Sequence, residues 1–500
     1  MERTARRRRV RIEHLVWAVM LYCGVVAAMW PKRTYDIWWH LATGKYIVQT
    51  RTIPDEDPFT YTRTGRPWIT HEWGWEVPMY LLYARWGHAG LMALRAMVAL
   101  VASGLLAWLL LRRGAAPLAA MAAGALAIFA ARPLLNDRPQ MATTALFVAM
   151  LCVIEHSRQG RHRWLLAAPL LMIPWVNLHG GFIFGPALLV LYALCTLPQW
   201  YRQRREGRPL QPAPALLIGV IVASLPACLV NPHGVAGAAY PLQYVIGGHA
   251  WHKTIITEYE SPDFSEPIFL FLGLLIVAAA VAFAASRRRA GLWDVALVGV
   301  FLFLTLKWQR NTALFAFAVA PVVALQLSEL LEWRGLAELG RGESQQPPAG
   351  LYVAIMAILS ILAIAAAPNA LSRVERAFAA DMPGECVDHI QRTGLQGRMF
   401  NTYRWGGYLI WRLWPQQRVF VDGRADVMGQ ELIEDYCTAV KLREGWRDVV
   451  EAYDFDWALL AADSPLCRGL ELLPEWSLEC ESETSRLYVR SSAPETPTEQ

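Results

Sequence analysis

The stretch that decides the fold is IFLFLGLLIVAAAVAFAA, residues 268–285, which is followed almost at once by Arg287, Arg288 and Arg289. A helix of about 20 apolar residues crosses a hydrocarbon core of about 30 Å. Lipid offers no hydrogen-bond partners, so a segment inside it must satisfy its own backbone polar groups, as a helix does. Residues 268–285 therefore predict a membrane-spanning helix that ends at a basic loop.

Stretches of this kind recur along the chain. We expect eleven spans, at residues 14–30, 89–111, 115–133, 140–156, 164–178, 181–199, 213–230, 267–285, 291–307, 312–331 and 350–367. Of the 500 residues, 55% are hydrophobic and 18% charged. The mean hydropathy is +0.26. Soluble domains carry about 25% charged residues. The composition thus predicts a polytopic α-helical membrane protein.

The basic residues indicate orientation. With these spans, six clusters fall on one side: Arg3 to Arg11, Arg112-Arg113, Arg158/Arg161/Arg163, Arg202/Arg204/Arg205/Arg208, Arg287–Arg289, and Arg334 with Arg341. The positive-inside rule makes that side, and with it the N-terminus, cytoplasmic. The net charge of +5 is modest. A charge distributed in this way reports topology and does not predict nucleic-acid binding.

The domain organisation follows from the same pattern. Residues 1–368 read as the membrane domain, which includes a first external loop at 31–88 and a connector at 334–348. The start of the chain reads as an uncleaved helix that ends at Trp30-Pro31. An odd number of spans places residues 369–490 outside the cytoplasm, and residues 491–500 read as a disordered tail. We expect the protein in a bacterial inner membrane.

Residues 369–490 alternate strand and helix patterns, which predicts a small soluble α/β domain. We expect helices within 371–394, at 429–440 and at 446–452, and strands at 398–402, 418–422, 457–461 and 486–489. Four of the eight cysteines lie here: Cys386, Cys437, Cys467 and Cys480. One or two disulfides are expected if this domain is extracytoplasmic.

The first external loop carries the most specific motifs. It reads YDIWWH at 35–40, DPFTY at 57–61, GRP at 65–67 and HEW at 71–73. Trp38, Leu41 and Ala42 have the spacing of an amphipathic helix lying at the membrane interface. The Asp-x-x-x-His pattern, with Asp-Pro-Phe followed by Gly-Arg-Pro, resembles this loop in the GT-C superfamily of membrane glycosyltransferases. The resemblance extends to oligosaccharyltransferase catalytic subunits, protein mannosyltransferases and lipid A aminoarabinosyltransferases.

The resemblance implies a polyprenyl-phosphate or polyprenyl-pyrophosphate sugar donor, and it implies that Asp36 is the catalytic acid/base residue. It also implies a helix that starts near Pro78. Two departures speak against glycosylation of protein sequons. The tail has Tyr403 to Tyr408 (YRWGGY) in place of a Trp-Trp-Asp-Tyr-Gly motif, and the second acidic motif is reduced to Asn136-Asp137-Arg138.

Asp36 suits the role of base on physical grounds as well. It is a lone carboxylate beside Trp38 and Trp39, where partial desolvation is expected to raise its pKa. The alternative is that Asp36 caps the helix that follows it.

Polar residues gather on the expected external side, where intramembrane or juxtamembrane charge indicates function. The candidate substrate-binding residues are His40, His71, Glu72, Asp137, Arg138, His179, His233, Glu258, Lys307 and Arg310. Arginine can clamp a phosphate with two hydrogen bonds. The alternatives are snorkelling for Lys307 and Arg310, a local ion pair between Asp137 and Arg138, and helix capping for the two Asn-x-His-Gly turns at 177–180 and 231–234. Cofactors stay open: Glu258 and Glu260 are candidates to bind either sugar hydroxyls or a divalent cation beside Asp36 and Asp137.

In the tail, Trp405, Tyr408, Asp422 and Arg424 are candidate ligand-binding residues, because α/β domains place such groups at strand ends. The alternative for Asp422 and Arg424 is a tight turn held by their ion pair. The leading function is transfer of a sugar or oligosaccharide from a lipid-linked donor to an acceptor that the sequence does not name. A polysaccharide polymerase or ligase, a transporter and a non-catalytic scaffold are the alternatives.

Overall fold

The structure is a computed structural model that describes residues 12–29, 34–246, 256–333 and 349–491. The predictions for Arg3 to Arg11, Trp30-Pro31, the connector 334–348 and the tail after residue 491 lie outside these residues. The backbone packing divides the chain into two compact units. Unit 1 consists of Met1–Lys32 and His88–Ser372, and unit 2 of Arg33–Gly87 and Arg373–Gln500. The first loop thus belongs with the C-terminal segment and not with the spans that flank it.

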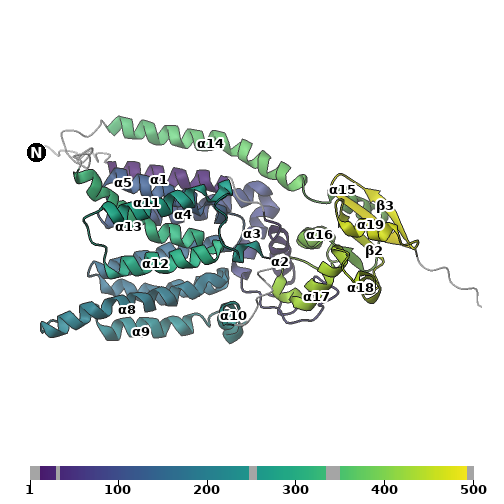
Figure 1. The fold of residues 1–500 in the computed structure, drawn as a ribbon, viewed down its shortest axis with the longest axis horizontal. Coiled ribbons are helices and arrows are strands. Elements are labelled where there is room, and N and C mark those ends of the chain that lie inside the picture. Colours follow the sequence, from purple (N-terminus) through teal and green to yellow (C-terminus); the bar gives the residue numbers. More distant parts are fainter. Residues whose placement is uncertain (1–11, 30–33, 247–255, 334–348, 492–500) are drawn as a thin grey trace, which may run out of the picture. The chain divides into compact units, whose positions relative to one another are not determined.

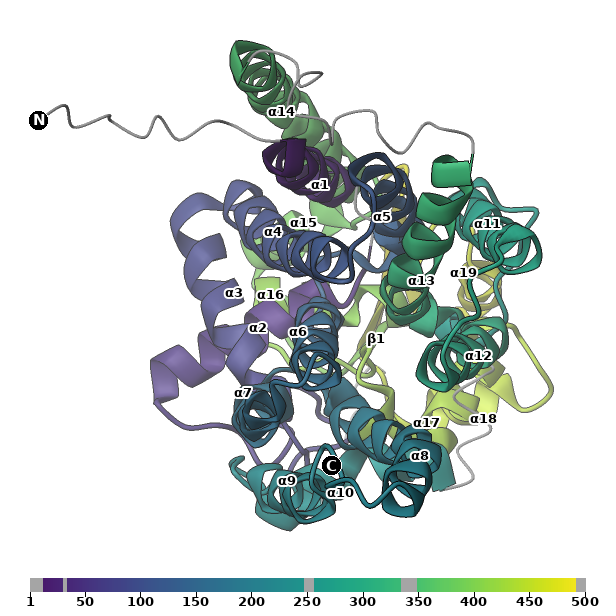
Figure 2. The same cartoon turned by 90° about the vertical axis from the view of Figure 1, so that its left-hand side faces the viewer.

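Unit 1 is a helical bundle, seen along its helices in Figure 2. Its helices are α1 (Ile12–Met29), α4 (His88–Arg112), α5 (Pro117–Ala131), α6 (Gln140–Arg158), α7 (Ala167–Leu178), α8 (Phe184–Arg205), α9 (Pro214–Ala227), α10 (Gly234–Ile246), α11 (Leu270–Ala285), α12 (Leu292–Lys307), α13 (Thr312–Trp333) and α14 (Ala349–Ala379). Short 3-10 turns join them: η1 (Arg132–Leu134), η2 (His162–Leu166), η3 (Gly180–Ile183), η5 (Thr257–Tyr259), η6 (Pro267–Phe269) and η7 (Gln309–Asn311).

Eight of these helices within the described residues are long and apolar enough to cross a membrane, some together with a flanking 3-10 turn: α1, α4, α5, α6, α8, α11, α13 and α14. The chain is an integral membrane protein. The other three expected spans are also helical, but α7, α9 and α12 have only 12, 14 and 16 residues. The predicted number of eleven spans therefore stays a prediction.

Small side chains let the helices of unit 1 approach closely. Helix α13 packs on α5, α11 and α12, and α5 contributes the buried Ala119, Ala120, Ala123 and Ala127. On α1, a Cβ atom at Gly24 would stand 3.1 Å from the carbonyl oxygen of Ala99 in α4. Close backbone approach through small residues is how helices associate in lipid, where no hydrophobic effect drives them together.

Unit 2 contains the small sheet of the chain, with helices around it (Figure 1). Its elements are α2 (Ile37–Thr50), α3 (Trp73–Trp86), α15 (Gly384–Thr393), β1 (Met399–Asn401), η8 (Tyr403–Trp405), α16 (Gly406–Leu413), α17 (Ala425–Val440), α18 (Trp446–Ala452), β2 (Trp457–Ala461), α19 (Pro465–Glu471), β3 (Trp476–Glu481) and β4 (Ser485–Arg490). The strand order is β1-β2-β4-β3, with β1 parallel to β2 and the other two pairs antiparallel.

One predicted strand is wrong. Residues 418–422 form no ladder in the sheet. Instead Val419 donates its N–H to the carbonyl of Phe59 and accepts from the N–H of Tyr61 in the first loop. The Asn401 side chain also bonds this segment, accepting from the N–H of Phe420 and donating to the carbonyl of Val421. The fourth strand is β3, an edge strand whose largely exposed side chains gave a weaker signal.

Two helices of the first loop form the other part of unit 2. Helix α2 confirms the helix expected around Trp38, Leu41 and Ala42, all of which are buried. Helix α3 begins at Trp73 and carries Pro78 in its interior, so the expectation of a helix start near Pro78 was late by about one turn. At the crossing of the two helices, a Cβ atom on Gly44 would stand 2.2 Å from the carbonyl oxygen of Glu76. Only glycine permits this approach.

A disulfide links the C-terminal segment to itself. Cys386 in α15 and Cys480 in β3 are bonded, with Cα atoms 5.8 Å apart. Cys437 and Cys467 are free thiols. One disulfide is thus present among the four cysteines for which one or two were expected.

Candidate functional site

Asp36 precedes α2, but its side chain does not cap that helix. The residue has helical backbone torsions (φ −66°, ψ −23°) and makes no capping hydrogen bond through its carboxylate. The carboxylate lies beside Gly423, where an added Cβ atom would stand 2.7 Å from Asp36 Oδ1 and 3.3 Å from Trp39 Nε1. Trp39 Nε1 is buried and has no hydrogen-bond partner among the described residues. The geometry gives no support to the capping alternative.

Further carboxylates share this neighbourhood. Burial raises the pKa of the Tyr403 hydroxyl well above its ordinary value, and the charges of Asp36, Asp422 and Asp426 raise it further. Three acidic residues from two distant parts of the sequence therefore lie near one tyrosine in unit 2.

Arg424 joins the first loop to the C-terminal segment. Its Nη2 atom lies 2.6 Å from Asp422 Oδ2 and 2.7 Å from Asp57 Oδ1, and all three side chains are buried. The guanidinium also stacks on the Trp68 ring, 4.4 Å from its centre. Burial alone would lower the pKa of Arg424, but Asp422 and Asp57 raise it, so the group stays charged. The structure thus shows the Asp422–Arg424 turn of the alternative interpretation, extended by Asp57, which the sequence analysis missed.

Trp405 and Tyr408 lie in the core of unit 2. Trp405 is fully buried and donates its indole N–H to the carbonyl of Asp381 at 2.9 Å. Tyr408 accepts from Arg412 at 2.6 Å, and its ring meets that of Trp38 edge to face at 5.2 Å. Between them, a Cβ atom on Gly406 would stand 2.1 Å from the carbonyl oxygen of Val421. These contacts hold Trp405 and Tyr408 in the core of unit 2.

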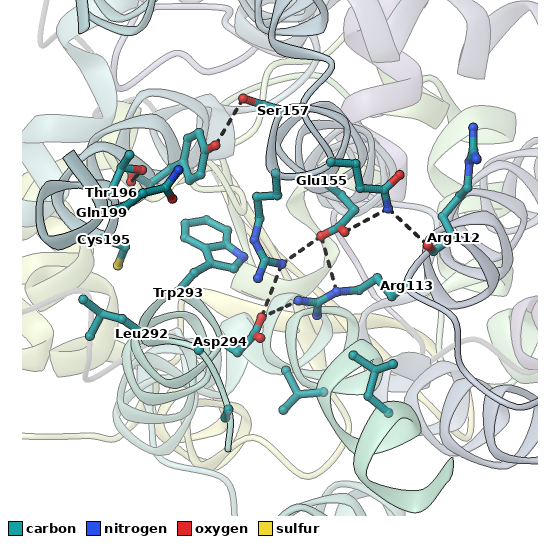
Figure 3. A pocket seen from close by; sticks show the side chains of 18 of the residues that line it. Arg112, Arg113, Glu155, Ser157, Cys195, Thr196, Gln199, Leu292, Trp293 and Asp294 are labelled. Atoms are coloured by element: carbon teal, nitrogen blue, oxygen red, sulfur yellow. Dashed lines mark hydrogen bonds and ion pairs between the residues drawn. The ribbon is translucent and has the colours of Figure 1, made fainter. Parts of the chain in front are cut away.

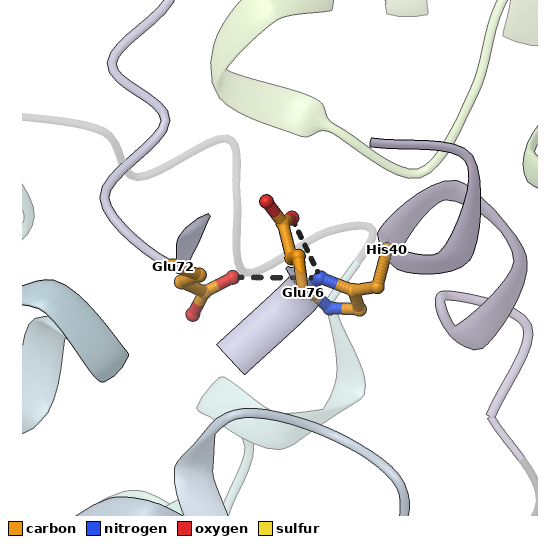
Figure 4. Close-up of side chains that lie close together, drawn as sticks. All are labelled: His40, Glu72 and Glu76. Atoms are coloured by element: carbon orange, nitrogen blue, oxygen red, sulfur yellow. Dashed lines mark hydrogen bonds and ion pairs between the residues drawn. The ribbon is translucent and has the colours of Figure 1, made fainter. Parts of the chain in front are cut away.

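A second cluster in the first loop contains the predicted site residues His40 and Glu72 together with Glu76 (Figure 4), and His71 contacts Glu72. His40 Nδ1 lies 3.0 Å from Glu76 Oε1 and 3.9 Å from Glu72 Oε2. His71 Nε2 lies 3.4 Å from Glu72 Oε1. Burial, with the nearby charge of Glu72, raises the pKa of Glu76 well above its ordinary value, although Arg424 opposes this. Burial lowers the pKa of His71, but Glu72 outweighs it and raises the pKa overall.

In unit 1, Asp137 and Arg138 each have an ion-pair partner. Asp137 pairs with Arg95 of α4, and both side chains are buried. Arg95 also donates to the carbonyl of Ala28 at 3.0 Å. Arg138 pairs with Glu258. In place of the alternative of a local pair between Asp137 and Arg138, each residue therefore pairs with another segment. Arg95 was missed, although a charge within an apolar span is itself a signal.

Arg310 belongs to the same part of unit 1 as Glu258. Turn η7 docks on η5, where Gln309 donates its backbone N–H to the carbonyl of Glu260 at 2.8 Å. The Arg310 guanidinium lies over the Tyr259 ring, 4.7 Å from its centre. Asp137, Arg138, Glu258 and Arg310 are thus brought together through these contacts. Lys307 instead stacks on the neighbouring Trp308 ring at 4.4 Å.

The two Asn-x-His-Gly turns are neighbours. Asn177 donates to the carbonyl of Val230 at 2.7 Å, which ties the first turn to the second. His179 Nδ1 accepts from the N–H of Gly181 at 3.0 Å and lies 2.8 Å from Thr143 Oγ1. In the second turn, Asn231 accepts from the N–H of His233 at 2.9 Å. Both turns show capping geometry.

A cavity of about 1050 Å³ lies elsewhere in unit 1 and holds none of the predicted site residues (Figure 3). It is lined by Arg112-Arg113, Arg158 and Arg288-Arg289, which come from three of the predicted cytoplasmic clusters. Glu155 and Asp294 pair with these arginines: Arg113 Nη2 lies 2.6 Å from Asp294 Oδ1, and Arg158 Nη1 lies 2.8 Å from Glu155 Oε2. Three clusters around one cavity agree with the expectation that they share one side.

Solved structures of an oligosaccharyltransferase and of ArnT have a similar fold, which agrees with the resemblance noted in the first loop. No protein-family model matches the sequence, and no curated protein sequence matches it either. The comparison therefore rests on structure.

Among solved structures, the Archaeoglobus fulgidus oligosaccharyltransferase tethered to an acceptor peptide is similar, with a TM-score of 0.54 and 13% identity over 90% of this chain and 69% of that one. The same organism's AglB, in complex with an inhibitory peptide and a dolichol-phosphate, gives 0.51 and 11% over 96% and 74%. ArnT from Cupriavidus metallidurans, bound to undecaprenyl phosphate, gives 0.52 and 16% over 97% and 99%. At such identities the likeness shows the fold.

Proposed function

We propose that the protein is a membrane glycosyltransferase that moves a sugar or oligosaccharide from a polyprenyl-phosphate or polyprenyl-pyrophosphate donor to an extracytoplasmic acceptor. The likeness to proteins solved with dolichol-phosphate and with undecaprenyl phosphate supports the donor class. The eleven expected spans and the six basic clusters support the orientation. The observation that carries the proposal is the position of Asp36, whose carboxylate does not cap α2 and turns to Gly423 and Trp39.

In this proposal Asp36 is the general base. It accepts the proton of the acceptor's hydroxyl or amino group while that group attacks the anomeric carbon of the donor sugar. The new bond to the sugar forms as the bond between the sugar and the lipid phosphate breaks, and the lipid phosphate leaves with the bonding electrons. After the step, the Asp36 carboxylate holds the acceptor's proton as a carboxylic acid.

Arg138 and Arg310 are the candidate phosphate-binding residues of the proposal. Arg138 is oriented by its ion pair with Glu258, and Arg310 by stacking on Tyr259. Hydrogen bonds from charged groups contribute about 1.5–3 kcal/mol each. Replacing either arginine by glutamine is therefore expected to raise the KM for the donor about 10-fold or more, with a smaller effect on kcat.

The experiment that tests the proposal supplies the purified full-length protein, in vesicles, with a polyprenyl-phosphate-linked labelled sugar and an envelope extract as the source of acceptor. Mass spectrometry follows the release of polyprenyl phosphate. Release that depends on the protein supports the glycosyltransferase. Movement of label across the vesicle membrane with the donor intact would identify a transporter instead and refute the proposal.

A further inference from the structure

The residues His40, Glu72 and Glu76 form a cluster that has no role in the glycosyl transfer proposed above. Its three ligand atoms, one from each residue, all lie within 4.8 Å of one another. Glu72 and Glu76 are four residues apart at the start of α3, so both carboxylates project from the same side of that helix. His40 reaches them from α2. The close packing at Gly44, one turn along α2 from His40, brings the two helices near enough for this contact.

Glu76 has an unsatisfied oxygen in this cluster. Its side chain is 1% exposed, and Oε1 faces His40 Nδ1 at 3.0 Å. Its second oxygen, Oε2, is buried and has no hydrogen-bond partner among the described residues. A buried polar atom without a partner destabilises a fold. A bound ion is one of the ways in which native structures satisfy such an atom.

We propose that His40, Glu72 and Glu76 bind a divalent transition-metal ion of the zinc type, which joins α2 to α3. One imidazole nitrogen and two carboxylate oxygens form a ligand set that zinc accepts, whereas magnesium and calcium take oxygen ligands. Zinc bonds of 2.0–2.2 Å in a tetrahedron place ligand atoms roughly 3.4 Å apart. The His40 contacts of 3.0 and 3.9 Å lie on either side of that value.

The surroundings of the cluster suit a metal centre. His71 Nδ1 donates to the carbonyl of Ile69 at 3.2 Å, which directs its Nε2 to Glu72 Oε1. Glu72 thus offers its other oxygen, Oε2, to the cluster, and His71 acts as a positioning residue of the kind that orients metal ligands. Three protein ligands leave a fourth coordination position for water.

The proposed metal site goes beyond the proposed function, and the two can be tested independently. If the protein binds no metal here, Asp36 still serves as the base, and a failed transfer reaction leaves the metal site intact. The metal content of the protein is the readout because it requires no substrate.

The test uses tag-free, full-length protein in detergent, stripped with a chelator, loaded with Zn²⁺ and separated from free ions. Plasma mass spectrometry then gives the ratio of zinc to protein. We expect about one zinc per chain for the wild type and for Glu56→Gln, a control at an exposed residue of the same loop. His40→Gln and Glu76→Gln, which keep the side-chain volume, are expected to lose at least nine-tenths of the bound zinc.

Co²⁺ provides a second probe, since it replaces zinc and its visible absorption reports ligand geometry. Loading with Co²⁺ is expected to give these bands in the wild type and not in His40→Gln, while Mg²⁺ does not compete. Glu72→Gln serves as a further variant if Glu76→Gln fails to fold, as judged by gel filtration. The proposal is overturned if the loaded wild type holds no zinc, or if the folded variants retain a full equivalent.

Discussion

The two units of this protein handle charge in different ways. In unit 1, an apolar bundle, buried charges occur as pairs, such as Arg95 with Asp137 and Arg113 with Asp294. Unit 2 also has a buried ion pair, that of Arg424 with Asp57 and Asp422, but its carboxylates gather as well: Asp36 lies with Asp422 and Asp426 around Tyr403, and Glu72 lies near Glu76. Paired charges stabilise helix contacts where lipid excludes water. Crowded carboxylates attract cations, and this difference between the units supports the proposal of a metal site in unit 2.

The largest expected effect concerns Arg424, the buried cation that pairs with Asp57 of the first loop and with Asp422. Arg424→Met leaves Asp57 and Asp422 buried without their shared partner, which is expected to lower the stability of unit 2 by about 3–5 kcal/mol. Arg418→Met, at an exposed arginine of the same segment, is the control and should change little. Thermal unfolding in detergent, followed by tryptophan fluorescence, measures both. Equal shifts in melting temperature for the two variants would show that the ion pairs of Arg424 with Asp57 and Asp422 do not stabilise unit 2.

The next effect concerns the disulfide of unit 2. Cys386 and Cys480 lie 94 residues apart, and closing such a loop stabilises a fold by about 2–4 kcal/mol. Cys386→Ser is expected to lower the melting temperature of unit 2 accordingly, while Cys437→Ser, at a free thiol, is not. Mass spectrometry of unreduced peptides checks the bond in the wild type. Finding Cys386 as a free thiol in the isolated membranes would contradict an oxidising environment for unit 2.

A smaller effect tests the crossing of α2 and α3. Gly44→Ala places a methyl group against the backbone of Glu76, and such overpacking costs about 1–3 kcal/mol. Gly299→Ala is the matched control in unit 1, because a Cβ atom there meets nothing within 4 Å. Thermal unfolding compares the two variants. A wild-type melting temperature for Gly44→Ala would contradict the close approach that positions His40.

The smallest effect on stability is expected at Gly423. The methyl group of Gly423→Ala meets the end of the Asp36 side chain, which can rotate away, so the stability changes by less than about 1 kcal/mol. Displacing the proposed base is nevertheless expected to slow turnover about 10- to 100-fold. Gly384→Ala, whose Cβ would be 3.9 Å from Tyr408, is the control. Unimpaired turnover in Gly423→Ala would contradict the proposal that Asp36 acts as the base.

Much of the fold follows from local pattern. Apolar stretches located every expected helix of unit 1, because hydrophobicity over 15–20 residues is a local property. Helices α7 and α9 are shorter than the stretches expected for them, and each contains a proline, Pro174 and Pro226 respectively. In unit 2, the segment 418–422 has the composition of a strand, yet it bonds to Phe59 and Tyr61, residues more than 350 positions away.

The candidate site shows the same limit. The motif around Asp36 and the turn at Asp422–Arg424 are visible in the sequence. The proximity of these two segments in space cannot be predicted from the sequence. No periodicity indicates which distant segment packs beside a glycine such as Gly423. Arg95 and Glu76 illustrate signals that were present: a charge within a span, and an acid four residues after Glu72 on a helix. Asp57 gave no signal beyond the Asp-Pro pair that suggests a turn.

The most direct test of the central claim is the turnover of Asp36→Asn, measured beside Asp55→Asn, which changes an exposed carboxylate of the same loop. Both variants are assayed as purified protein in vesicles for release of polyprenyl phosphate at saturating and limiting donor. Loss of a general base is expected to lower kcat by about 10²–10⁴-fold while the KM for the donor stays near that of the wild type. A kcat for Asp36→Asn within about twofold of the wild type would contradict the assignment of the base.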